Sequence, residues 1–200
     1  MTNVTLIEFL KEALEKFEAC TEDREKLESK LEDAKQLAQK HEENGELEKY
    51  LDECEKVYDL SMKLLEPGPS ILARAVRASI AFGNSCFKVA KHYKEAGMLV
   101  EAGLVIGRLA NKTCSAQFYS ILQRSFDIAD KQGRNMYIQE LKNYTACVEA
   151  ALEKDPNNAG CWIFLAYYLS PVTQKKKTQA YKRAAELGNK EAIRTLEGQK

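Results

Sequence analysis

The chain has 200 residues, of which 44% are hydrophobic and 30% charged, with only four Pro and ten Gly among many Ala, Leu, Glu and Lys. This composition predicts an all-α protein of one elongated or two small domains, and it argues against sheet and against a largely disordered chain. The formal net charge is zero and no stretch resembles a signal peptide or a membrane span, so we expect a cytoplasmic protein that makes no use of a membrane.

The first predicted element covers residues 6–41 and shows a heptad pattern. Small or apolar residues recur at steps of four and three, with only Arg24 interrupting the series: Leu6, Leu10, Ala13, Phe17, Cys20, Leu27, Leu31, Ala34, Ala38 and His41. Neither Gly nor Pro occurs between Met1 and Asn44. The region is therefore one long helix, or two helices that divide near Thr21, which can cap a new helix.

A second helix follows a stop at Asn44-Gly45, because Gly favours the left-handed turn that ends a helix. From Glu46 to about residue 66 the apolar and small side chains fall on one helical face: Leu47, Tyr50, Leu51, Cys54, Val57, Tyr58, Leu64 and Leu65. We expect residues 1–66 to form an acidic, coiled-coil-like helical hairpin.

Pro67-Gly68-Pro69 is the clearest boundary in the sequence, because two prolines flanking a glycine cannot continue a helix. The charge changes sign there: residues 1–66 hold 19 acidic and 10 basic residues, and residues 67–200 hold the remaining 11 and 20. We place a second, basic domain at residues 70–200. The two charged surfaces either both face water or dock on each other, within one chain or between chains.

The second domain divides into short helices at its Gly, Pro and Asn residues. Ser70 can cap a helix that runs to about Ala96 and ends at Gly97. Later stops predict helices near 98–110, 115–132, 135–154, 158–169, 173–187 and 189–198. Such lengths with short connections indicate antiparallel helix pairs.

Glycines, cysteines and histidines of this sequence fit a structural role better than a chemical one. No strand precedes Gly103 and Gly107 and no Gly-Lys-Ser/Thr follows them, so we interpret them as sites of close helix contact. Six cysteines lack a Cys-x-x-Cys pair, which predicts buried free thiols at residues 20, 54, 86, 114, 147 and 161. His41 and His92 lack ligand spacing, so we expect no metal, no cofactor and no enzymatic activity.

Three segments of the second domain carry the spacings of a known helical repeat. The first, residues 83–116, has the series Cys86, Val89, Ala90, Tyr93, Gly97, Ala102 and Ile106. The second has Trp162, Leu165, Ala166 and Leu169 after the junction Asp155-Pro156-Asn157-Asn158. The third runs from Ala180 to Ala192 across Gly188. The first two resemble tetratricopeptide repeats and the third resembles their Sel-one-like subtype, over roughly residues 83–196.

This resemblance implies a right-handed α-solenoid of antiparallel helix pairs whose first helices line a concave groove. Adjacent helices would cross closely at the small residues Ala90, Ala102, Ala166 and Ala180. The groove would offer these polar and aromatic side chains: Asn84, Lys88, Lys91, Tyr119, Gln123, Arg124 and Tyr167. Lys and Arg at such positions bind a carboxylate or an acidic peptide through charge-assisted hydrogen bonds.

A basic cluster near the carboxyl end contains Lys175, Lys176 and Lys177 and lies close in sequence to Trp162 and Tyr167. It forms a solvated surface, binds an acidic protein surface, or binds nucleic acid. The spacing of Trp162 predicts a core position for the indole rather than a stacking platform.

The sequence thus predicts a non-enzymatic adaptor, chaperone or scaffold that binds a partner protein or an acidic peptide in a helical-repeat groove. One alternative is a structural protein that self-assembles through the heptads of residues 6–41. A second alternative is nucleic-acid binding through the basic carboxyl-terminal half.

Overall fold

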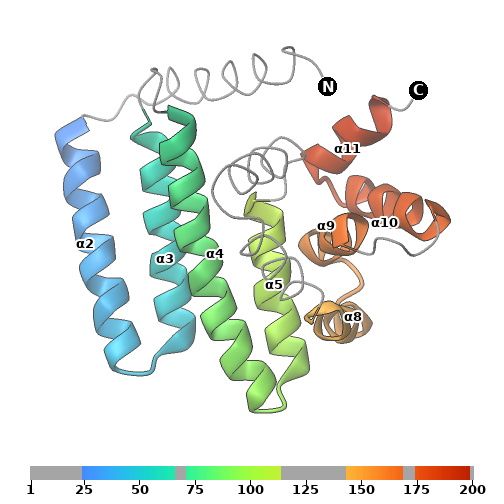
Figure 1. Cartoon of the computed structure of the whole chain (residues 1–200), viewed down its shortest axis with the longest axis horizontal. Helices are drawn as coiled ribbons and strands as arrows, with labels where there is room; N and C mark the ends of the chain where they lie inside the picture. The colour runs from blue at the N-terminus through green and yellow to red at the C-terminus, as the bar shows by residue number, and fades with distance from the viewer. Residues whose placement is uncertain (1–23, 66–70, 114–142, 169–173, 199–200) are drawn as a thin grey trace. The chain divides into compact units, whose positions relative to one another are not determined.

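The computed structural model describes residues 24–65, 71–113, 143–168 and 174–198. Within these ranges every regular element is a helix, which confirms the predicted all-α fold class (Figure 1). With the labels of Figure 1 the helices are α2 (Arg24–Glu43), α3 (Leu47–Lys63), α4 (Ile71–Glu95), α5 (Leu99–Thr113), α8 (Thr145–Lys154), α9 (Ala159–Tyr168), α10 (Gln174–Glu186) and α11 (Lys190–Glu197).

Two compact units, Met1–Ser85 and Cys86–Lys200, divide the chain within α4. We call them the N-terminal and the C-terminal unit. The boundary predicted at residues 67–69, the heptads before Arg24 and the helix predicted near 115–132 lie outside the described residues. The N-terminal unit runs past that predicted boundary, so the first half of α4 belongs to the same unit as α2 and α3.

Glycines end α2, α4 and α10 as the sequence predicts. Gly45, Gly97 and Gly188 have φ angles of 71°, 77° and 83°. At each of them the N–H groups of the glycine and of the next residue bond back to carbonyls of the last helical turn, as from Glu46 N to His41 O at 2.9 Å. A residue with a β-carbon is strained at such φ values, so these glycines fix where the helices stop.

In the N-terminal unit, α2 packs on α3 through the predicted heptad positions. Leu27, Ala34 and Ala38 are buried, and Leu31 and His41 are half-buried. The described part of the heptad pattern is therefore covered by α3 of the same chain.

α3 lies between α2 and the first half of α4 (Figure 1). Tyr58 of α3 stacks on Phe82 of α4, with ring centroids 5.4 Å apart and planes inclined by 28°. Near the ends of the two helices Leu65, Ile71 and Ala75 form a small buried cluster. The apolar face of α3 is thus wide enough to contact a helix on each side.

In the C-terminal unit, glycines bring α5 against α8 and α9. A β-carbon on Gly103 would overlap the carbonyl group of Cys147, and one on Gly160 would overlap that of Gly107. A β-carbon on Gly107 would lie 2.6 Å from Cys161 Sγ. These contacts confirm the predicted role of Gly103 and Gly107. They also join α5 of the first repeat-like segment to α9 of the second.

The small residues predicted at helix crossings are buried in this unit. Ala90, Ala102 and Ala166 are fully buried and Ala180 is 2% exposed. α8 packs on α9, α9 on α10 and α10 on α11. Cys86, Cys147 and Cys161 are buried free thiols, as predicted, and Cys54 of the N-terminal unit is a half-buried one. Cys20 and Cys114 lie outside the described residues.

Trp162 does not take the predicted core position. It is half-buried, because α9 is apolar on nearly all sides and Cys161, Ile163 and Phe164 fill the core around it. Its indole N–H donates to Pro156 O at 2.9 Å. The ring therefore covers the turn between α8 and α9.

The helix predicted near residues 135–154 is present from Thr145 to Lys154, but the two described residues before Thr145 are not helical. Asn143 and Tyr144 form a turn, and α8 begins at Thr145. The Tyr144 ring is buried beside Phe87 of α4, with centroids 5.8 Å apart, and the Lys94 amino group lies 5.0 Å from its centroid. Burial of this ring and the cation–π contact favour a turn over a continuous helix here.

We predict that Gly103→Ala destabilises the C-terminal unit by about 1–3 kcal/mol, because the added methyl overlaps the Cys147 carbonyl. In an uncrowded helix the same change stabilises by roughly 0.5–1 kcal/mol. Urea unfolding followed by the fluorescence of Trp162, the one tryptophan of the chain, measures the effect in this unit.

Gly198→Ala is the matched control. Gly198 has helical φ and its nearest obstacle is Arg194 O at 3.5 Å, so its unfolding free energy should change by less than about 0.5 kcal/mol. Equal midpoints for both variants would contradict the close contact at Gly103.

A second prediction concerns the α2–α3 turn. Glu46 accepts a 2.6 Å hydrogen bond from Lys49 Nζ and lies 2.6 Å from His41 Nδ1, and these hydrogen bonds lower its pKa from 4.5 to about 2. A carboxyl group whose pKa is lowered by folding stabilises the fold at pH values above its pKa in the unfolded chain. That stabilisation is lost as the pH falls toward its pKa in the folded chain. The melting temperature of the chain should exceed that of Glu46→Gln at neutral pH, and the difference should shrink between pH 4.5 and about 2. Circular dichroism melts across that range test this, and a constant difference would contradict it.

Candidate functional site

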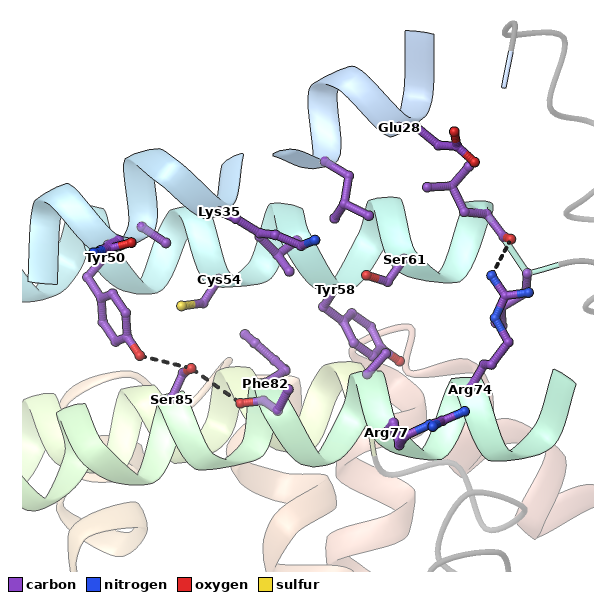
Figure 2. Close-up of a pocket in the computed structure, with 18 of the residues that line it drawn as sticks. Glu28, Lys35, Tyr50, Cys54, Tyr58, Ser61, Arg74, Arg77, Phe82 and Ser85 are labelled. Carbon is purple, nitrogen blue, oxygen red and sulfur yellow. Dashed lines mark hydrogen bonds between the residues drawn. The ribbon is translucent and has the colours of Figure 1, made fainter. Parts of the chain in front are cut away.

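A groove of about 870 Å³ lies in the N-terminal unit between α2, α3 and the first half of α4. We call it the α2–α4 groove. Figure 2 shows α3 behind it and side chains of α2 and α4 on its two sides. Its lining residues are Arg24, Glu28, Leu31, Lys35, Ala38, Gln39 and Glu42 of α2, Tyr50, Cys54, Val57, Tyr58, Ser61, Leu64 and Leu65 of α3 and the residues just after it, and Arg74, Arg77, Ala78, Ala81, Phe82 and Ser85 of α4.

The floor of the α2–α4 groove is apolar and only partly covered. Leu31, Val57 and Ala78 are half-buried, and Ala81 is exposed. The stacked pair of Tyr58 and Phe82 lies beneath them and holds α3 against α4. The floor therefore offers apolar surface that another apolar side chain can cover, which is favourable at about 25 cal/mol per Å² removed from water.

One end of the α2–α4 groove carries hydroxyl and thiol groups. Tyr50 Oη donates to Ser85 Oγ at 3.1 Å, and Ser85 Oγ donates to Ala81 O at 3.2 Å (Figure 2). Burial raises the pKa of Tyr50 to about 12, so its hydroxyl stays protonated and remains a donor. Burial also raises the pKa of the neighbouring Cys54 thiol. The Glu42 carboxylate of α2 also lies near this end, and its charge adds to the rise in the pKa of both groups.

The other end of the groove is cationic. Arg74 donates to Leu64 O at 3.4 Å, and Arg24 forms a 2.7 Å ion pair with Glu28. Arg77, one turn along α4 from Arg74, is exposed and has no ion-pair partner among the described residues. Figure 2 shows Glu28, Arg74 and Arg77 at the same end. We call Arg24, Arg74 and Arg77 the arginine end. It holds more positive than negative charge, although the sequence of residues 1–66, which contributes α2 and α3, is acidic overall.

The binding residues predicted from the sequence lie elsewhere. Asn84, Lys88 and Lys91 are exposed on one face of α4 and do not line the groove, and Lys91 pairs with Glu95 at 3.9 Å. Tyr119, Gln123 and Arg124 lie outside the described residues.

The remaining predicted binding residues come from two other helices of the C-terminal unit. Tyr167 of α9 is half-buried and packs edge-on against Tyr181 of α10, with centroids 5.6 Å apart. Lys175, Lys176 and Lys177 lie in the first turn of α10, where Lys177 is half-buried. The structure therefore distributes the predicted set over α4, α9 and α10.

The sequence did not predict the α2–α4 groove, because its charge pattern indicated a binding surface in the basic half, residues 67–200. The lining side chains come from three helices on both sides of the proline boundary. One signal was available: the apolar face of α3 includes Tyr50 and Tyr58 and is wider than contact with one partner helix requires. Arg74 and Arg77, three residues apart on the next helix, are a weaker signal.

The described residues contain no group of three or more His, Cys, Asp or Glu side chains placed to hold a metal ion. Among the helices that the structure describes, none combines the length and the apolar sequence that a bilayer crossing needs. No family model, no curated protein and no solved structure matches this chain.

We predict that Cys54 reacts with iodoacetamide more slowly in the folded chain than in the urea-unfolded chain at the same mildly alkaline pH. A raised pKa lowers the thiolate fraction, and the thiolate is the nucleophile. Mass spectrometry of the peptide that contains Cys54 measures both rates separately from the other cysteines. Equal rates would contradict the burial of this thiol in the α2–α4 groove.

Proposed function

We propose that this chain is a non-enzymatic protein-interaction module that binds an acidic, amphipathic helix of a partner protein in the α2–α4 groove. The observation that carries the proposal is the combination of a half-buried apolar floor with a cationic end. Binding of this kind suits an adaptor, chaperone or scaffold in the cytoplasm.

The dimensions of the groove suit a helix better than a compact small molecule. Its α3 side extends from Tyr50 to Leu65, which is about 22 Å at a helical rise of about 1.5 Å per residue. About four turns of a partner helix cover that length. A helix laid between α2 and α4 would complete a four-helix arrangement, and it would cover the half-buried side chains of the floor.

The arginine end favours a partner with negative charge. Guanidinium groups bind carboxylates with two parallel hydrogen bonds, and Arg77 is exposed and has no ion-pair partner among the described residues. Arg74 and Arg24 already have partners in Leu64 O and Glu28. We therefore expect them to contribute mainly to the positive electrostatic potential at this end of the groove. Charge complementarity of this kind raises the association rate and sets the orientation of the bound helix.

The repeat-like C-terminal unit supports the same class of function through its resemblance to tetratricopeptide and Sel-one-like repeats. Such repeats bind other proteins and carry no chemistry of their own. Asn84, Lys88 and Lys91, exposed along α4, remain predicted contacts for an acidic partner.

The test uses two synthetic amphipathic peptides of about 16 residues with leucines at helical spacing. One carries Glu and the other Lys at all polar positions. Fluorescence anisotropy with the full chain should show tighter binding of the Glu peptide, by about tenfold or more at low salt, and this preference should shrink as salt screens the arginine end.

Arg77→Glu should abolish the preference for the Glu peptide and improve binding of the Lys peptide. Lys26→Glu makes the same charge change at an exposed position of α2 that does not line the groove, and it should leave the preference intact. Equal affinity of both peptides for the unmodified chain, or equal effects of the two substitutions, would rule out the proposal.

A further inference from the structure

The three helices around the α2–α4 groove alternate in direction. α2 begins with Arg24 at the arginine end, and α3 runs back toward that end from Tyr50 to Leu64. The first half of α4 leads away again, from Arg74 to Ser85 (Figure 2). A helix bound in the groove lies next to both α2 and α4, and antiparallel neighbours place opposite ends of their helix dipoles together. This packing puts the carboxyl end of the bound helix at the arginine end.

The arginine end already holds the carboxyl end of one helix. Leu64 follows the last residue of α3, and its carbonyl accepts a hydrogen bond from Arg74 at 3.4 Å (Figure 2). The last carbonyls of a helix have no partner within the helix, and a guanidinium beside them also meets the negative end of the helix dipole. Arg77 lies one turn further along α4 and is exposed, with no ion-pair partner among the described residues. It is placed to bind the carboxyl end of a second helix as Arg74 binds that of α3.

The opposite end of the groove suits the amino end of a helix. Burial is the main cause of the raised pKa of Tyr50 and Cys54 at this end, and the negative charge of Glu42 adds to it. The amino end of a helix carries unpaired N–H groups and the positive end of the dipole, so a nearby carboxylate stabilises it. In the reverse orientation the amino end would face the three guanidinium groups instead. Both ends of the groove therefore favour the same direction.

We infer that the α2–α4 groove binds a partner helix in one direction, antiparallel to α2 and α4, and that it selects a helix whose last turn is acidic. Arg77 pairs with a carboxylate of that turn through two parallel hydrogen bonds. This inference rests on the proposed function and adds the direction of the ligand and the position of its charge. Acidic side chains destabilise the last turn of an isolated helix, so contact with the arginine end is what makes this charge pattern favourable.

The test uses two peptides of about 16 residues with the same composition, acetylated and amidated to remove the terminal charges. Both have leucines at helical spacing. One carries three Glu in its last turn and the other carries them in its first turn. In water the second peptide forms more helix, because carboxylates stabilise the amino end. The full chain should nevertheless bind the first peptide about fivefold or more tightly, as measured by fluorescence anisotropy at low salt.

Two substitutions show whether the arginine end sets this preference. Arg77→Glu should remove or reverse it. Lys26→Glu makes the same charge change at an exposed position of α2 that does not line the groove, and it should preserve the preference. The helicity of each free peptide is the same in every experiment, so a change in the ratio of the two affinities isolates the contribution of the substituted residue.

Cys54 provides a direct readout of direction, because its thiol lines the groove about 15 Å from Leu64 along α3. A bromoacetyl group on the amino end of the first peptide should alkylate Cys54 about tenfold or more faster than the same group on the side chain of a lysine added at its carboxyl end. The bound peptide supplies the reactive group at an effective concentration in the millimolar range. Mass spectrometry of the fragment that contains Cys54 measures both rates.

The outcomes separate this inference from the proposed function. Equal affinity of the two peptides, or equal or faster alkylation from the carboxyl end, would show that the groove binds acidic helices without the inferred direction. Equal shifts of the affinity ratio by Arg77→Glu and Lys26→Glu would show that the arginine end does not recognise the acidic turn. If neither peptide binds, the proposed function is wrong, and the inference is wrong with it.

Discussion

Close approach of helices through residues with little or no side chain determines how both compact units are built. In the C-terminal unit Gly103, Gly107 and Gly160 let the backbones of α5, α8 and α9 touch. In the N-terminal unit Ala34 and Ala38 are small, buried residues on the stripe of α2 that packs against α3. A small residue at a crossing shortens the distance between helix axes, so the larger side chains on either side interdigitate at native packing density. The positions of small residues therefore decide which helices are neighbours.

The α2–α4 groove is a consequence of this packing. α3 packs on α2 on one side. On its other side the ring of Tyr58 stacks on Phe82 and joins α3 to α4. A helix with two neighbours still has a third side, and on α3 that side carries Val57 and Cys54 rather than charged residues. Apolar surface left half-covered is unfavourable in water, and a monomeric protein retains it mainly where something else covers it. The packing of the unit thus leaves the apolar surface on which the proposed binding role rests.

The two ends of the α2–α4 groove differ in charge. The hairpin sequence is acidic, yet the arginine end collects three guanidinium groups because α4 contributes Arg74 and Arg77 beside Arg24 of α2. At the opposite end Tyr50 and Ser85 are joined by a hydrogen bond, and the nearby charged residue is the acidic Glu42. An apolar floor with a cationic end accepts a helix in one orientation better than in the other.

The sequence by itself determined the helices and many of their ends. Gly45, Gly97 and Gly188 stop helices because their φ angles exclude other residues, and that preference is local. The heptad stripe of α2 and the buried alanines of the C-terminal unit were also predictable, since periodicity and side-chain size are read directly from the chain. Local patterns failed at Trp162 and at Tyr144, where competition for space in the core decided the outcome.

Only the tertiary structure decided where the groove lies. Its lining side chains come from α2, α3 and α4, and nothing in the sequence states which faces of these helices meet. Arg74 and Arg77 are ordinary surface cations until α3 packs against their helix and Leu64 presents a carbonyl to Arg74. The proline-rich stretch marks a loop in the sequence, whereas contacts across it place the first half of α4 in the N-terminal unit. Helix formation depends on neighbours a few residues away, but a groove depends on residues distant in sequence, and only packing brings those together.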